Sequence, residues 1–126
     1  MIEKKCYCGS PRKFQDCCEP FINGAEKAPT ALALMRSRYS AYATHEADYL
    51  VATTHISRRN YHSKSEILNW ATSNQWLQLE IINATENTVE FKAYFLDRNL
   101  QKQIHHELST FQLENGSWFY VNGEFF

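Results

Sequence analysis

Cysteine is missing from residues 19–126, although the chain contains four cysteines. No apolar run approaches the ~20 residues that a membrane-spanning helix requires. No apolar segment follows the N-terminal Met-Ile-Glu-Lys-Lys, so we expect no secretory signal either. With 13 basic and 14 acidic residues, the chain lacks the charge excess typical of proteins that bind nucleic acid or anionic membranes. These absences predict a cytoplasmic protein, and disulfides seldom persist in the cytoplasm.

The composition that remains is that of a packed protein. Apolar residues make up 44% of the 126 residues and aromatic residues 14%, which is typical of globular chains. This length suits one compact domain with a small appended module. We expect the module at residues 1–22, a connector at residues 23–29 and the main domain at residues 30–126.

The four cysteines form two close pairs in the stretch CYCGSPRKFQDCC. Cys6 and Cys8 make the first pair, and Cys17 and Cys18 follow after eight residues. Two close pairs joined by a loop are typical of a tetrahedral Zn²⁺ site with four protein ligands, which is closed and therefore structural. The loop itself predicts a short helical turn over Pro11–Asp16, after Ser10 as its cap.

Two alternatives compete with zinc. Four cysteines allow three disulfide pairings, but a cytoplasmic location and the adjacent Cys17-Cys18 pair argue against all of them. A redox centre would more typically show Cys-x-x-Cys at the start of a helix, a motif that this chain does not contain. A zinc site is the preferred interpretation. Binding of the ion would also drive folding of the short cysteine segment.

Four basic residues surround the cysteines: Lys4, Lys5, Arg12 and Lys13. Zinc with four thiolates carries a net charge of about −2, and nearby cations offset that charge. The same side chains are also candidates for a surface that binds a partner. The sequence favours charge balance over docking, because basic docking patches usually extend over larger fields.

The pattern C-x-C-G-S-x6-C-C resembles the SEC-C zinc module, which is best known from the C-terminus of the SecA preprotein translocase. The resemblance implies that Cys6, Cys8, Cys17 and Cys18 are the zinc ligands. In SecA the module engages the chaperone SecB and ribosomes. The resemblance therefore implies a docking role toward another protein, related to chaperones, translation or secretion.

Helical periodicity dominates the first part of the main domain. Thr30 is a good cap for a helix that runs to about Ala43, and a second helix is expected from Glu46 to about Thr53. The polar residues 55–62 predict a loop. Ser63-x-x-Glu66 is a capping box that opens a third helix.

The period then changes to the alternation of strands. Strands are expected to begin at Trp76, Thr88 and Lys102, and Asn115-Gly116 predicts a hairpin turn into a fourth. Three helices followed by an antiparallel meander predict an α+β fold, with the helices packed on one face of a curved sheet.

Several stretches are together similar to the uncharacterised, bacterial YchJ-like family, most specifically LMRSRY at residues 34–39, and also the segment HELSTFQLENGSWFYVNG. The similarity runs over essentially the whole chain. It implies a SEC-C zinc module followed by a cone-shaped nuclear transport factor 2-like (NTF2-like, or cystatin-like) domain. The family supplies no settled activity.

A cone of this kind would place a pocket between its helices and its sheet, so catalysis has to be considered. Glu107 as a base, with Tyr39 or His55 as its partner, would supply acid–base chemistry, and Arg36 is a further candidate. The family resemblance adds weight to five positions, Arg36, Arg38, His55, Glu107 and Ser109. The competing and preferred interpretation is structural, with Arg36 or Arg38 ion-paired to Glu107 so that helix and sheet are fixed together. We expect His45, His62 and His105 at the surface.

Three functions follow in order of preference. The first is a non-catalytic zinc-containing adaptor that docks on another protein. The second is a small-molecule-binding protein, or an enzyme of hydrolase or isomerase type, that uses the pocket of the cone. The third is a ribosome- or RNA-associated module that uses the basic residues around the cysteines.

Overall fold

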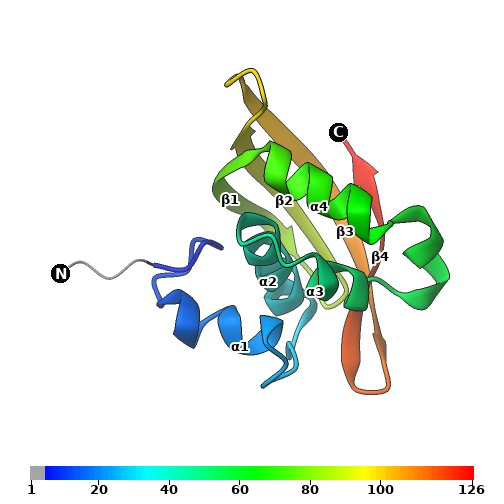
Figure 1. Cartoon of the computed structure of the whole chain (residues 1–126). Helices are drawn as coiled ribbons and strands as arrows, with labels where there is room; N and C mark the ends of the chain where they lie inside the picture. The colour runs from blue at the N-terminus through cyan, green and yellow to red at the C-terminus, as the bar shows by residue number, and fades with distance from the viewer. Residues whose placement is uncertain (1–4) are drawn as a thin grey trace.

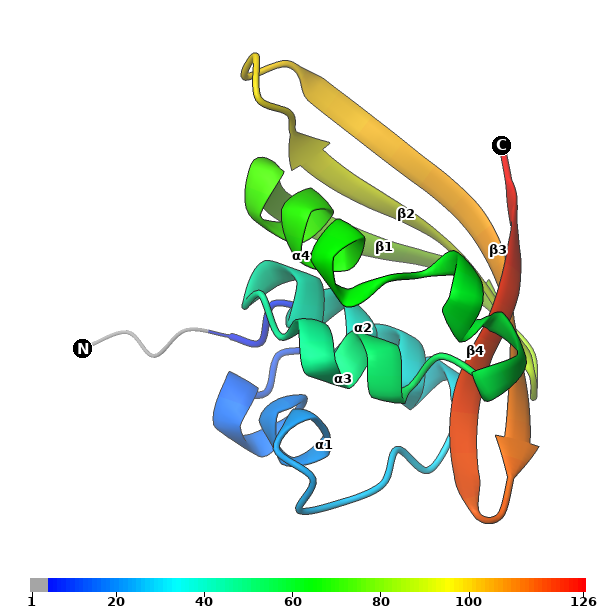
Figure 2. The ribbon, with the colours of Figure 1, turned by 45° about the vertical axis from the view of Figure 1, so that its right-hand side comes forward.

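The computed structural model describes residues 5–126 and shows an α+β fold, as expected. Four antiparallel strands form one curved sheet in the order β1-β2-β3-β4, and the helices pack on its concave face (Figures 1 and 2). In chain order the elements are η1 Phe14–Asp16, α1 Glu19–Ile22, α2 Ala31–Ala43, α3 Ala47–Ala52, η2 Ile56–Tyr61, α4 Lys64–Ser73, β1 Gln75–Ala84, β2 Thr88–Leu96, β3 Lys102–Glu114 and β4 Ser117–Phe125.

Side-chain caps fix where the main helices begin. The Thr30 hydroxyl accepts a hydrogen bond from the amide of Ala33 at 3.0 Å, and the Ser63 hydroxyl accepts one from the amide of Glu66 at 3.2 Å. The expected helices α2, α3 and α4 are confirmed. The loop expected at residues 55–62 is wrong, because residues 56–61 form the 3₁₀ helix η2, whose first turn is capped by the ring of His55.

The expected four-stranded meander is also confirmed. Asn115 and Gly116 both have positive φ, at 53° and 80°, which is the backbone of a type I′ hairpin turn. This turn sets Glu114 opposite Ser117. A register shift follows at Thr110/Phe111 and bends the ribbon made by β3 and β4.

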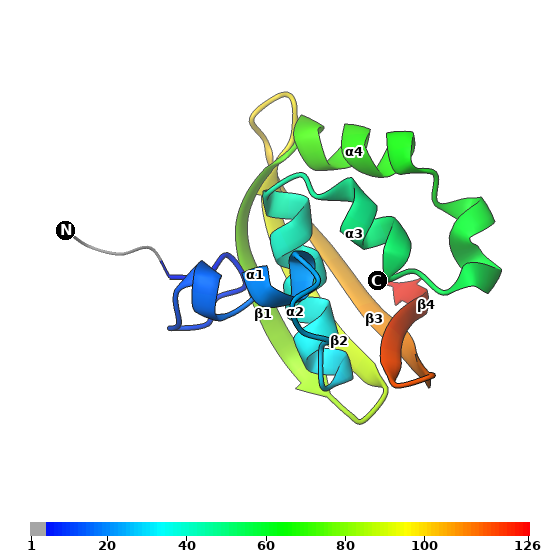
Figure 3. The same ribbon diagram turned by 60° about the horizontal axis from the view of Figure 1, so that its bottom comes forward.

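The cysteine segment packs against the main domain. Cys6, Cys8 and Cys18 are buried in the same hydrophobic cluster as Leu34 of α2 and Val89 of β2. Figure 3 shows this N-terminal segment beside α2 and β1. Burial of this shared apolar surface stabilises both parts together. None of the helices within residues 5–126 combines the length and the apolar composition needed to cross a membrane.

Candidate functional site

The side chains of all four cysteines converge at one point. Their sulfur atoms all lie within 4.8 Å of one another. Cys8 Sγ is 3.7 Å from Cys17 Sγ, which in turn is 3.9 Å from Cys18 Sγ. A tetrahedral zinc ion with Zn–S bonds of about 2.3 Å would hold sulfur atoms about 3.8 Å apart. Both the donor chemistry and the spacing therefore suit a closed site for a thiophilic metal ion.

A small hairpin brings the two cysteine pairs together. The amide of Cys6 donates to the carbonyl of Arg12 at 2.8 Å, and Gly9, with φ at 90°, donates its amide back to the Cys6 carbonyl at 3.1 Å. Only Phe14–Asp16 of the helical turn expected over residues 11–16 is helical, and that segment is a 3₁₀ helix. The Ser10 hydroxyl instead accepts a hydrogen bond from the Arg12 amide in a local turn.

Helix α2 supplies polar groups to the cysteine cluster. Arg36 Nη1 donates to the Cys8 carbonyl at 2.9 Å and lies 3.8 Å from Cys8 Sγ, while the Ser40 hydroxyl lies 3.6 Å from Cys6 Sγ. A guanidinium at this distance favours the thiolate form that metal ions bind. Hydrogen bonds from Cys18, and then from Cys8, also lower the pKa of the Cys6 thiol.

The basic residues flank this hairpin on its outer side. Lys5 and Arg12 are exposed, whereas Lys13 is half-buried and pairs through its backbone with Lys5. Lys4 lies outside the described residues. Tyr7 is 44% exposed and contacts Phe14 edge to face, with ring centroids 5.3 Å apart.

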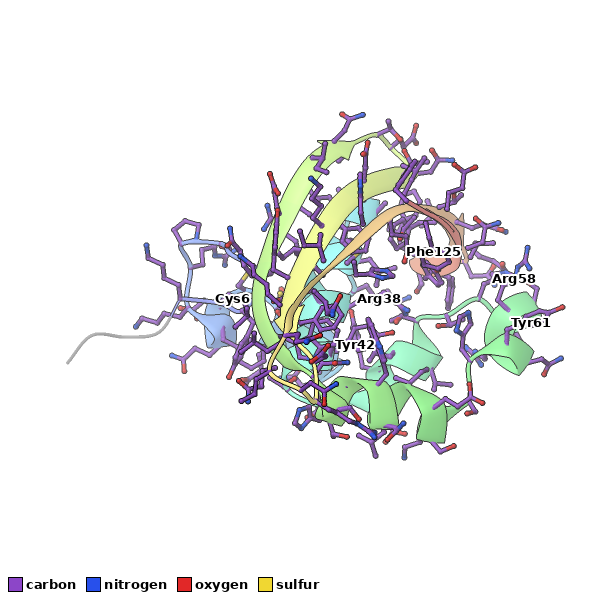
Figure 4. The ribbon with its side chains drawn as sticks, turned by 90° about the horizontal axis from the view of Figure 1, so that it is seen from above. Cys6, Arg38, Tyr42, Arg58, Tyr61 and Phe125 are labelled. Atoms are coloured by element: carbon purple, nitrogen blue, oxygen red, sulfur yellow. The ribbon has the colours of Figure 1, made fainter. Side chains whose placement is uncertain are left out.

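A second feature is a cavity of about 180 Å³ between the helices and the concave face of the sheet. Its wall includes a set of aromatic side chains, those of Tyr39, Tyr42, Trp70, Trp76, Phe91, Tyr120 and Phe125. The polar lining includes Arg38 from α2 and Glu107 from β3. Figure 4 shows Arg38 and Tyr42 in the space between sheet and helices, with Cys6 on the outer side. An apolar cavity with a few convergent polar groups is the usual form of a small-molecule site.

Glu107 is 6% exposed and is held by hydrogen bonds from three side chains. His105 Nε2 lies 2.7 Å from one carboxylate oxygen, while the hydroxyls of Ser109 and Tyr120 donate to the other. Burial alone would raise the pKa of this carboxyl, but the hydrogen bonds and the charge of His105 outweigh burial and leave the pKa below its usual value. Glu107 is therefore ionised at neutral pH. Gly123 on β4 leaves the space that the carboxyl occupies.

Arg38 is 7% exposed and contacts the ring of Tyr120, whose hydroxyl donates to Glu107. Its Nη1 atom donates to the carbonyl of Leu50 at 3.0 Å and to the hydroxyl of Thr53 at 2.7 Å. Its guanidinium carbon lies 4.8 Å from the centroid of the Tyr120 ring. Burial, followed by the positive charge of Arg38, lowers the pKa of the nearby His62 ring.

The residues proposed for catalysis are divided between different places. Glu107 and Tyr39 line the cavity. Arg36 contacts the cysteine hairpin instead, and His55 lies outside the cavity lining, where its Nε2 is 2.5 Å from Glu114. The expected ion pair between Glu107 and an arginine is wrong, since within residues 5–126 no arginine nitrogen comes within 4.0 Å of that carboxylate. The reason is that both oxygens of the Glu107 carboxylate already have hydrogen-bond partners, namely His105 and the hydroxyls of Ser109 and Tyr120.

Sequence reasoning missed the two cavity histidines. His62 and His105, expected at the surface, are half-buried and line the cavity. A usable signal for His105 was strand parity, because it shares a face of β3 with the buried Phe111. Ile104 obscured that signal, since it is apolar and yet 55% exposed on the other face. Tyr42, Trp70, Trp76 and Tyr120 line the same cavity.

Comparison with known proteins gives a consistent result over almost the whole chain. The family model described as "YchJ, middle NTF2-like domain" matches residues 30–123. A UPF0225 protein of Photorhabdus laumondii is 42% identical over 125 residues, which cover 94% of this chain and 79% of that protein. A UPF0225 protein of Geobacter sulfurreducens is 39% identical, with 94% and 77% covered.

Solved structures extend the likeness to the cysteine segment. The solution structure of a SEC-C motif containing protein from Rhodopseudomonas palustris superposes with a TM-score of 0.88 at 36% identity, covering 96% of this chain and 98% of that one. The crystal structure of a SEC-C motif containing protein from Psychrobacter arcticus gives a TM-score of 0.80 at 33% identity, with 94% and 81% covered.

Proposed function

Because this chain belongs to the YchJ family of UPF0225 proteins, which joins a SEC-C cysteine motif to an NTF2-like domain, we propose that it is a zinc-stabilised protein that binds a small molecule in its cone. The observation that carries the proposal is the cavity of about 180 Å³ that contains both a buried arginine and a buried carboxylate. Buried charges cost free energy, and such groups in a cavity are typical of binding sites.

Zinc is the proposed ion for the four cysteines. Thiolate-only sites select soft or borderline metals, and a tetrahedral set of four sulfurs is typical of structural zinc. Cys6, Cys8, Cys17 and Cys18 would hold the ion and leave no position open to substrate, so the ion would stabilise α2 rather than react. All four thiols are free in the described structure, which fits the reducing cytoplasm in which we place the protein.

The test of the proposed function uses neutral ring compounds, because their binding depends only on whether the cavity accepts a ligand and not on the ligand's charge. The zinc-loaded protein is mixed with benzyl alcohol or benzamide, and binding is followed by the fluorescence of Trp70 and Trp76 and by thermal shift. The matched control is Ala93→Leu, which places extra methyl groups in the cavity at a residue that is 4% exposed. Binding that Ala93→Leu abolishes supports the proposal. If no ring compound binds, neither these neutral ones nor benzoate, or if the variant binds equally well, the cavity is not a ligand site.

A docking role is the second candidate function. It is favoured by the exposure of Lys5, Arg12 and Tyr7 on the outer side of the cysteine hairpin, away from the cavity. The partner would present an acidic surface and, by the resemblance to SecA, would belong to chaperone, translation or secretion machinery. Capture of such a protein that is lost in Lys5→Glu/Arg12→Glu but kept in Ala93→Leu supports docking. Capture that both variants retain argues against this surface, and RNA binding that weakens steeply with salt would assign the basic residues to nucleic acid.

A further inference from the structure

Among the residues that the structure describes, no acceptor meets one edge of the Arg38 guanidinium. Its Nη1 atom donates hydrogen bonds to Leu50, Thr53 and Thr54. Within residues 5–126, the Nε and Nη2 atoms meet no acceptor, and no carboxylate oxygen lies within 4.0 Å of the group. No fully enclosed polar atom of the described side chains lacks a partner, so these two nitrogens are not fully enclosed, and Arg38 is one of the residues that line the cavity.

The other charged group in the cavity, the carboxylate of Glu107, already has hydrogen-bond partners in the protein. Glu107 accepts hydrogen bonds on both of its oxygens, from His105, Ser109 and Tyr120. Tyr120 contacts both charged groups, because its ring lies under Arg38 while its hydroxyl donates to Glu107. The cavity therefore offers unused donors on Arg38 and a satisfied acceptor on Glu107. Such a site selects a ligand that brings its own acceptor and negative charge.

Tyr42 adds a second donor near Arg38. The two residues are one helical turn apart on α2 and both line the cavity. The Tyr42 hydroxyl makes no hydrogen bond to any described residue. Figure 4 shows both side chains directed into the space between the helices and the sheet.

The rest of the cavity fixes the size and kind of the ligand body. Trp70 and Trp76 meet edge to face with centroids 4.9 Å apart, and Phe91 belongs to the same wall. The volume of about 180 Å³ slightly exceeds that of an engineered cavity of about 150 Å³ that holds benzene. One six-membered ring with a small substituent therefore fits, and aromatic walls favour a flat ring.

We propose that the cavity binds a small aromatic monocarboxylate, with its carboxylate on the free edge of Arg38 and on the Tyr42 hydroxyl, and its ring against Trp70, Trp76 and Phe91. The inference rests on the proposed function, since it names the ligand class of that same cavity. A carboxylate matches the planar edge of a guanidinium, on which two N–H groups point the same way.

The test compares benzoate, its neutral analogue benzamide, and acetate, using calorimetric titration of the zinc-loaded full chain. Benzoate is expected to bind about tenfold or more tightly than benzamide, and acetate to bind weakly because it has no ring. Arg38→Gln removes the charge and should weaken benzoate binding by about tenfold or more while leaving benzamide binding within about twofold. Arg98→Gln, which removes an exposed arginine outside the cavity, should change neither.

Arg38→Gln also loses hydrogen bonds that hold α3, so a milder variant is included. Tyr42→Phe removes one hydroxyl and should weaken benzoate binding about threefold or more without changing benzamide binding. Equal binding of benzoate and benzamide, or benzoate binding that neither variant weakens, overturns the ligand class but leaves the cavity as a binding site. Absence of binding by both ring compounds overturns the proposed function itself.

Discussion

Arg36 and Arg38, two residues apart on α2, donate hydrogen bonds on opposite sides of the helix. Arg36 bonds to the carbonyl of Cys8 in the cysteine hairpin, and Arg38 bonds to the carbonyl of Leu50 beside the cavity. Residues two positions apart on a helix are rotated by about 200° around the helix axis. The side chains of Arg36 and Arg38 therefore point in nearly opposite directions. One helix therefore contacts both the cysteine cluster and the cavity, and the order of the cysteine segment should affect the cavity.

The first prediction concerns the metal. Cys8→Ser removes a thiolate that is 1% exposed, and we expect less than one zinc ion per chain and a Tm lower by roughly 10 °C or more, because metal binding and folding are coupled. Metal content by mass spectrometry and thermal unfolding measure both effects. Ser10→Ala, on the same hairpin, is the control and should retain its zinc. A Cys8→Ser variant with full zinc content and unchanged Tm would refute the four-cysteine site.

The second prediction concerns Arg36, which contacts the cluster without being a ligand. Arg36→Gln removes a positive charge 3.8 Å from Cys8 Sγ, and zinc affinity should fall roughly 10- to 100-fold, as for other groups that orient metal ligands. Competition with a chelator of known affinity gives the change. Arg98→Gln should behave as the unmodified protein. If both variants show the same fall in zinc affinity, the fall is caused by the change in net charge, and the role assigned to Arg36 is wrong.

Local signals in the sequence were sufficient for most of the backbone. The Thr30 and Ser63 caps and the Asn115-Gly116 turn act within four residues of their own position, so they place α2, α4 and the β3–β4 hairpin without knowledge of the rest. The cysteine spacing is equally local. These elements could therefore be predicted from the chain alone.

The cavity could not be predicted in the same way, because it depends on which surfaces meet. The sequence shows that Arg36 and Arg38 diverge, but only the packing of the cysteine hairpin on one side of α2 shows which arginine enters the cavity. On β3 both faces carry apolar residues, so alternation alone could not say that Glu107 faces inward. Ile104 on one face is 55% exposed, whereas Phe111 on the other face is 2% exposed.

The third prediction concerns Gly123, which lies on β4 against the carboxyl of Glu107. A methyl group there would lie 2.6 Å from Glu107 Cδ, and three hydrogen bonds prevent that side chain from moving away freely. Gly123→Ala should therefore lower the free energy of unfolding by about 1–3 kcal/mol, measured by urea denaturation.

A double-mutant cycle provides the control for this prediction. In a Glu107→Ala background the space beside residue 123 is open, so Gly123→Ala should cost much less there. An equal cost in both backgrounds would place the cause in the strand backbone and not in the contact with Glu107.

The fourth prediction is a pH dependence caused by Glu107. Its carboxyl is buried, yet hydrogen bonds from His105, Ser109 and Tyr120 hold its pKa below the unfolded value of 4.5. Such a group stabilises the folded state at every pH above the unfolded pKa, and this contribution is lost as the pH falls through the lower, folded pKa. The Tm advantage that the Glu107 carboxylate gives the natural protein over Glu107→Gln should therefore shrink as the pH falls below about pH 4.5.

Glu90 gives a matched comparison, because its carboxylate meets the ring of His106 at 2.8 Å but on a more exposed part of the sheet. Water screens that pair, so Glu90→Gln should lower the Tm at pH 7 by less than Glu107→Gln does. If the natural protein instead gains stability relative to Glu107→Gln as the pH falls from 7 to about 4.5, Glu107 is already protonated in the folded protein. In that case burial would have outweighed its three donors, and the cavity would hold a single charge, that of Arg38.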